Sequence, residues 1–240
     1  MHLPTLTGLI DRRILINYRC DPAALAAFLP HPFRPKVING WGMTGICLIR
    51  LKAVRPKGLP AFLGITSENG AHRIAVEWEE GGQLQSGVYI PRRDTNSRLN
   101  ALAGGRVFPG IHHLTRFNVT EKAGNYAISF AGDDGTSLAI HAAKTTQWPD
   151  GSVFHNLESA SCFFEKGSLG YSPNIENGHF DGLELYTEKW KVSPLLVQKV
   201  HSSFFEDQNI FPEGAIHFDN ALLMENIPHE WRSKGGKLRS

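Results

Sequence analysis

The chain has 240 residues, 41% of them hydrophobic and 20% charged, and its formal net charge is +2 at pH 7. This composition is typical of a globular protein with a sizeable core, and no linker-like segment divides the chain, so we expect a single domain over residues 1–240. Basic residues are scattered and do not alternate with aromatic ones, which disfavours nucleic-acid binding. No apolar run is long enough to span a bilayer as a helix, so no membrane association is expected.

The cysteine and histidine patterns exclude several kinds of site. Cys20, Cys47 and Cys162 are odd in number and far apart, which excludes a disulfide framework and suits a reducing compartment. The N-terminal segment has no basic region followed by an apolar core, so it is not a signal peptide and a cytoplasmic location is expected. The eleven histidines show neither HxH nor HExxH spacing, and no glycine-rich phosphate loop is present, so the sequence predicts no metal and no cofactor.

The first third of the chain predicts strands joined by tight turns. A β-branched run predicts a strand over 13–18, and Asp21-Pro22 opens a short helix through Phe28. Asn39-Gly40 is a strong hairpin signal between two strands, and the continuously apolar run 46–49 predicts a strand that is buried on both faces.

The stretch 86–117 predicts a strand, a helix, a turn and a second strand. The first strand, over 87–90, is expected to end at Pro91, and Asp94 or Thr95 to cap the helix that follows. Gly104-Gly105 ends this helix. Three apolar residues at helical spacing are expected to pack on the sheet: Leu99, Leu102 and Ala103.

The second half of the chain predicts more antiparallel strands. A meander covers 114–119, 126–131 and 137–146; a short helix capped by Asn156 or Ser159 follows; strands cover 183–192, 195–205 and 215–224. We expect 167–178 to be a surface loop and the tail 234–240 to be frayed. The pattern as a whole predicts an α+β, mainly antiparallel fold: a bent sheet or cone-shaped barrel with a few short helices and an interior pocket for a small molecule.

Three stretches carry a resemblance to a known family. They are Arg12–Leu25 with Phe28-Leu29-Pro30; Glu68-Asn69-Gly70-Ala71-His72-Arg73; and Gly87-Val88-Tyr89 through Arg106-Val107-Phe108-Pro109. Together they resemble the acetoacetate decarboxylase-like superfamily and, within it, the uncharacterised branch called domain of unknown function 2071 (YqjF-like). The resemblance covers about the first half of the chain, and it implies a twisted antiparallel cone or barrel with an interior pocket and makes a homo-oligomer plausible.

The resemblance also bears on the chemistry. In the decarboxylases a lysine forms a Schiff base with a β-keto acid, and a neighbouring lysine lowers its pKa. The positions here that best match this lysine pair are His112 and His113. Because imidazole cannot form an imine, the sequence argues against authentic acetoacetate decarboxylase chemistry.

The candidate site residues follow from their types and from this resemblance. Either histidine could exchange protons near neutral pH, but neighbouring strand residues point to opposite faces, so only one can face the pocket, and the resemblance favours His112. The alternative is a surface or packing pair. Glu68 matches a family position that supplies a pocket carboxylate. In an apolar pocket its pKa would be raised and it could act as an acid or base together with His112; the alternative is a charge at a strand edge.

Arginine suits a substrate carboxylate because its planar guanidinium can bind both oxygens. Arg12, Arg13 and Arg106 are the candidates, together with His113 as a further ligand contact, and the sequence does not decide whether Arg12 or Arg13 faces inward. Arg73 is a weaker candidate, since a strand arginine is more often solvated. The leading hypothesis is an acid/base catalyst on a small oxo- or carboxylate-bearing molecule; the alternatives are a non-catalytic binder or carrier of an apolar acid, and a structural subunit without a cavity.

Overall fold

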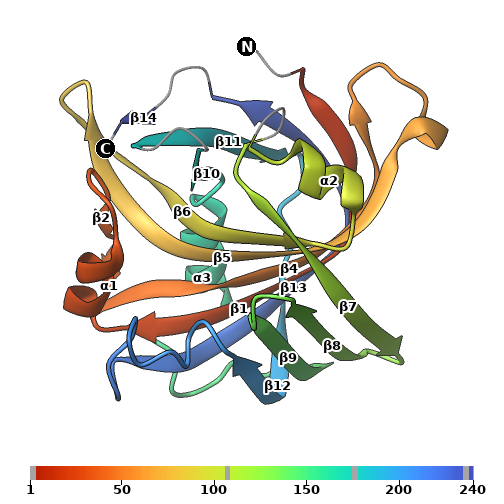
Figure 1. Cartoon of the computed structure of the whole chain (residues 1–240). Helices are drawn as coiled ribbons and strands as arrows, with labels where there is room; N and C mark the ends of the chain where they lie inside the picture. Colours follow the sequence, from red (N-terminus) through yellow and green to blue (C-terminus); the bar gives the residue numbers. More distant parts are fainter. Residues whose placement is uncertain (1–3, 106–108, 175–177, 235–237, 240) are drawn as a thin grey trace.

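The computed structural model describes residues 4–105, 109–174, 178–234 and 238–239. It confirms an α+β fold dominated by a mostly antiparallel sheet, which is strongly bent without forming a regular barrel. Figure 1 shows the long strands running across the middle of the molecule, with shorter strands above and below them.

The strands are β1 (Leu6–Cys20), β2 (Arg34–Pro35), β3 (Val37–Ile38), β4 (Trp41–Pro56), β5 (Ile65–Glu80), β6 (Gln83–Thr95), β7 (His112–Lys122), β8 (Asn125–Gly132), β9 (Ser137–Lys144), β10 (Leu169–Pro173), β11 (His179–Thr187), β12 (Ser193–Ser202), β13 (Ile216–Ser233) and β14 (Leu238–Arg239). The helices are α1 (Pro22–Phe28), α2 (Arg98–Ala103) and α3 (Leu157–Glu165), with a 3-10 turn η1 (Ala61–Leu63).

Strand β1 pairs with β13 on one side and with β4 on the other. Beyond β4 come β5 and then β6, each antiparallel to the strand before it. Strand β6 also pairs in parallel with β7 and with β10, so it joins the lower strands to the upper ones in Figure 1. The site described below lies where these central strands meet β10 and β11.

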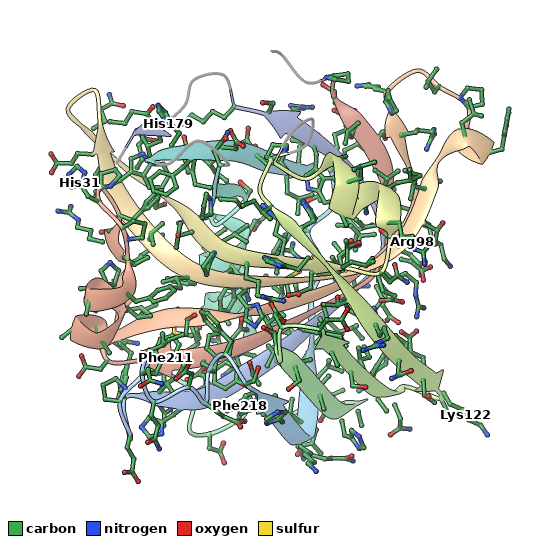
Figure 2. All side chains as sticks on the ribbon, viewed as in Figure 1. His31, Arg98, Lys122, His179, Phe211 and Phe218 are labelled. Carbon is green, nitrogen blue, oxygen red and sulfur yellow. The ribbon has the colours of Figure 1, made fainter. Side chains whose placement is uncertain are left out.

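The central strands are buried on both faces, and each face has its own apolar core. Side chains alternate along a strand, so consecutive residues belong to different cores. One core holds Ile14, Ile46 and Ile74 with the aromatic residues of β8 and of the loop that follows β12. The other holds Leu15 and Cys47 with the aromatic residues of α3. Figure 2 shows side chains projecting from both faces, with Arg98 at the start of α2 and Lys122 at the far end of β7.

Several predicted elements are confirmed. Helix α1 begins where expected, because the Asp21 side chain accepts hydrogen bonds from the backbone N–H groups of Ala23 and Ala24. Asn39 and Gly40 both have positive φ and connect β3 to β4. The run 46–49 is buried along its whole length.

The predictions around Pro91 and the start of α2 are wrong. Strand β6 continues through Pro91 to Thr95, because its register with β5 shifts between His72 and Ile74 and a bulge there tolerates the missing N–H. Ser97 caps α2 by accepting from the Asn100 N–H. Asp94 is instead buried in β6.

Two further predictions are wrong. Leu99 and Leu102 do not pack on the sheet; they are 62% and 63% exposed. The segment 167–178 is not only a surface loop, because it contains β10, which pairs with β11 and carries the fully buried Tyr171. None of the helices in the described ranges is long and apolar enough to cross a membrane.

Candidate functional site

Two adjoining cavities lie on the α3 side of the central strands. The smaller has a volume of about 260 Å³ and the larger about 660 Å³. Residues that line both of them are Ile49, Ala71, Arg93, Leu183 and Trp231. The shared wall makes the two cavities the polar and apolar parts of one candidate site.

Three arginines from different strands line the smaller cavity: Arg13 from β1, Arg73 from β5 and Arg93 from β6. The strand register explains how Arg73 reaches it. In that register Gly45 stands between Asn17 and Arg73, and because it has no side chain the guanidinium can cross it. Arg73 Nη2 donates to Asn17 Oδ1, and the guanidinium lies 5.0 Å from the Phe164 ring centroid.

Arg13 and Arg93 have few strong acceptors around them. Arg13 Nε donates to Cys47 Sγ at 3.1 Å and its Nη1 lies 3.9 Å from Met224 Sδ. Sulfur is a weak acceptor, so an oxygen anion would be a better partner for this guanidinium. Arg93 Nε donates to Ser172 Oγ at 3.0 Å.

These three guanidinium groups have no acidic partner in the part of the chain that the structure describes. Within the described ranges, none of them forms an ion pair. Glu165 and Glu184 line the same cavity, but both are exposed to solvent.

Arg73 and Arg93 keep their protons despite burial. It lowers the pKa of Arg73 and of Arg93 to about 10, and the nearby Cys47 opposes the shift in both cases. Both groups therefore stay protonated at neutral pH. The smaller cavity is a concentration of positive charge that an anion can neutralise.

The larger cavity is mostly apolar. Strands β1, β4 and β5 supply part of its wall, and helix α2 supplies Leu99, Leu102 and Ala103, which the sequence had placed against the sheet. The exposure of the two leucines follows from this position beside the cavity. An apolar portion of a ligand would find its contacts here.

His112 lines the larger cavity, whereas its neighbour His113 is exposed. The parallel register of β6 and β7 places His112 opposite Arg93. His112 Nδ1 donates to the Gly110 carbonyl at 2.9 Å, which makes Nε2 the acceptor nitrogen of the neutral ring. Burial, with Arg93, lowers the pKa of His112 to about 4, so the ring is neutral at pH 7.

Arg12 and Glu68 lie together on the opposite face of the sheet. Arg12 is 2% exposed and pairs with Glu68 and, at 3.3 Å, with Glu121. Glu68 also accepts from Arg50 Nε at 2.5 Å, and neither Arg12 nor Glu68 lines either cavity. Of the two adjacent arginines, Arg13 is the one at the cavity.

The remaining candidates lie elsewhere. Arg106 is outside the described residues. In the described part of the chain no lysine lines either cavity, and Lys144 Nζ donates to Glu225 at 2.6 Å on the surface. Sequence reasoning missed Arg93 and Cys47. Side chains alternate between the two faces along β4 and β6. This alternation would place Cys47 and Arg93 on the same face as Arg13, but only after the register between the strands is known.

Comparison with known proteins agrees with this architecture. A family model for domain of unknown function 2071, described as an uncharacterized conserved protein, matches residues 10–213. No curated protein sequence matches the chain significantly.

Several solved structures are similar to this chain over nearly its whole length. Acetoacetate decarboxylase from Legionella pneumophila has a TM-score of 0.66 at 10% identity, covering 98% of this chain and 88% of its own. An acetoacetate decarboxylase-like enzyme from Sphingomonas wittichii has a TM-score of 0.62 at 13% identity, covering 100% and 95%. The enduracididine biosynthesis enzyme MppR in complex with pyruvate has a TM-score of 0.56 at 12% identity, covering 100% and 91%. At these identities the likeness shows the fold.

Proposed function

The chain belongs to the family of domain of unknown function 2071, and from that premise we propose that it binds a small carboxylate-bearing molecule, of the oxo-acid type, on the α3 side of its central strands. The carboxylate lies among Arg13, Arg73 and Arg93 in the smaller cavity. The rest of the molecule extends into the larger one. A structural neighbour that holds pyruvate supports the ligand class at the level of the fold.

The observation that carries this proposal is the set of three arginines that have no acidic partner among the described residues. Guanidinium groups are costly to bury together, and in most structures carboxylates compensate them. Here the acceptors are a thiol, a thioether, a hydroxyl and an amide. A bound carboxylate supplies the charge that this part of the sheet lacks.

Two activities are compatible with this pocket. An acid/base catalyst would use His112, which is neutral at pH 7 and stands opposite Arg93. A carrier of an apolar acid would need only the arginines and the larger, mostly apolar cavity. A Schiff-base mechanism is disfavoured because no lysine among the described residues lines either cavity.

The proposed function is compatible with the cytoplasmic location that the sequence predicts. The three cysteines are free, which suits a reducing, cytoplasmic environment. Homo-oligomerisation stays a prediction, and light scattering of the purified protein measures it directly.

Calorimetric titration with 2-oxo acids of increasing chain length, each compared with its uncharged amide, tests the function. We expect the acids to bind and the amides to bind at least about tenfold more weakly, because each charge-assisted hydrogen bond contributes about 1.5–3 kcal/mol. Arg93→Gln and Arg13→Gln should each weaken acid binding by a similar factor. Arg116→Gln, which removes an exposed arginine paired with Asp133, is the matched control and should bind like the wild type.

Equal binding of acids and amides would contradict the proposal. Borohydride reduction in the presence of pyruvate, read by intact-protein mass, is the complementary experiment. We expect no adduct. A stable lysine adduct would show that imine chemistry occurs here and that the lining residues have been misassigned.

A further inference from the structure

Cys47 lies inside the arginine cluster, and the proposed binding of a carboxylate gives its sulfur no role. The side chain is 6% exposed and lines the smaller cavity. Arg13 Nε donates to Sγ at 3.1 Å, and Arg73 and Arg93 line the same cavity as this cysteine. Cationic groups beside a sulfur that can be reached from a cavity are the surroundings in which reactive cysteines are found.

The other two cysteines lie in different surroundings. Cys20 is fully buried in the opposite core, and burial together with the adjacent Asp21 raises the pKa of its thiol to about 12. Cys162 is exposed on α3. They provide an inert and an accessible reference within the same chain.

A second observation points to a ligand next to Cys47. Arg73 is 7% exposed and lines the same cavity, and its Nε has no hydrogen-bond partner among the described residues. A buried charged donor without an acceptor is unfavourable, and an anion in the cavity would relieve it. The sulfur and the anion site therefore share one wall.

We propose that Cys47 is a nucleophile that adds reversibly to the carbonyl carbon of a 2-oxo acid bound by the arginines. This rests on the proposed function and narrows its ligand class. In a 2-oxo acid the electrophilic carbon is one bond from the carboxylate, so the guanidinium that holds the carboxylate also holds this carbon near the sulfur. A 3-oxo acid carries its carbonyl one atom further away.

The step is a simple addition. The sulfur forms a bond to carbon 2 while the π pair of the C=O bond moves to oxygen. That oxygen takes up the proton that the thiol has released. The product is a thiohemiketal; no group leaves, and neither oxidant nor reductant is consumed.

The first experiment compares alkylation by iodoacetate, which is anionic, with alkylation by neutral iodoacetamide, mapped by peptide mass spectrometry. The quantity compared is the rate with iodoacetate divided by the rate with iodoacetamide. Its value at Cys162 is the reference for an exposed thiol. We expect the ratio at Cys47 to be at least roughly tenfold higher, as expected when the arginines bind the carboxylate of the reagent. Arg13→Gln should lower it towards the reference, and Arg116→Gln should leave it unchanged. An equal ratio at both cysteines would overturn the inference.

The second experiment observes the adduct itself. Pyruvate labelled with carbon-13 at carbon 2 should give a new tetrahedral-carbon signal with the wild-type protein and with Cys162→Ser, but not with Cys47→Ala. Unchanged melting temperatures would show that the variants are folded, and Cys47→Ser serves if Cys47→Ala is unstable.

The outcomes separate the two proposals. If Cys47→Ala and the wild type bind 2-oxo acids equally and neither gives the tetrahedral signal, the carboxylate site stands and the covalent step is wrong. If no 2-oxo acid binds and none protects Cys47 from iodoacetamide, the binding function fails as well.

Discussion

Arg12 and Arg13 are adjacent in β1, yet their side chains lie on opposite faces of the sheet in very different surroundings. Arg12 faces Glu68 and Glu121 and is neutralised by them, whereas Arg13 faces the cavity beside Cys47. The first is part of a buried charge network and the second is available to a ligand. The family resemblance pointed to both arginines. Alternation along a strand shows that they face opposite sides of the sheet, but it does not show which of them faces the cavity.

Glu68 is predicted to be essential for stability. Removing its charge by Glu68→Gln leaves Arg12 buried with less compensation, and we expect a loss of about 3 kcal/mol or more in the free energy of unfolding, measured by urea denaturation. Glu77→Gln, on the same strand and paired at 4.0 Å with an exposed Arg34, should cost less than about 1 kcal/mol. A Glu68 variant as stable as the Glu77 variant would contradict this prediction.

The pairing of β1 with β4 allows the site to form, because Gly45 lets the strands approach closely. A Cβ atom added there would stand 2.2 Å from the Ile16 carbonyl oxygen, which is backbone and cannot move aside. The same residue lies between Arg73 and Asn17 in the register. Strand pairing and arginine placement therefore depend on one position.

We expect Gly45→Ala to lower the free energy of unfolding by about 1–3 kcal/mol, the usual cost of forcing extra volume into a packed interior. It should also weaken carboxylate binding, since the added methyl group would block the Arg73 side chain from crossing β4 towards Asn17. Gly151→Ala, where the added atom meets open space, is the control and should melt like the wild type. Unaltered melting of both variants would refute the argument.

At the level of secondary-structure elements, the sequence correctly predicted those that depend only on residues close together in the chain. The Asp21 cap, the Asn39-Gly40 turn and the apolar run 46–49 were all sufficient by themselves. Strand β10 and the passage of β6 through Pro91 were missed, because both depend on partners distant in the chain. The site was predicted in part for the same reason: residue types indicated arginine and histidine, but only the register selects those that share a cavity.

Among the described residues, His72 and His229 are buried and His112 is half-buried beside the larger cavity, and all three rings are neutral at pH 7. His72 is fully buried, with its ring centroid 4.6 Å from that of Phe204, and His112 and His229 lie in other parts of the sheet. Burial is the main cause that lowers the pKa of His72 to about 3 and those of the other two to about 4.

These shifts predict loss of stability in mild acid. Between about pH 6.5 and pH 4 the unfolded chain binds protons on these histidines that the folded chain does not. The free energy of unfolding should therefore fall as pH falls, by up to about 1.4 kcal/mol per pH unit for each histidine, and this contribution is complete above pH 6.5. His72→Phe should reduce the slope by one histidine's share in urea titrations from pH 7 to pH 4.5. An identical slope in the variant would disprove its part in the effect.

The two-faced construction of β1 has a consequence for how such sequences change. Successive side chains of a strand point to opposite faces, so one residue inserted or deleted between Arg13 and Tyr18 would move each of the two arginines to the other face of the sheet. The pairing of β1 with β4 is irregular between Ile10 and Arg12 and regular from Arg12 to Cys20, so the faces of both arginines are set from the C-terminal side of the strand. Gaps placed in this strand when relatives are aligned would therefore misassign the site, whereas gaps in the Gly81-Gly82 turn would not.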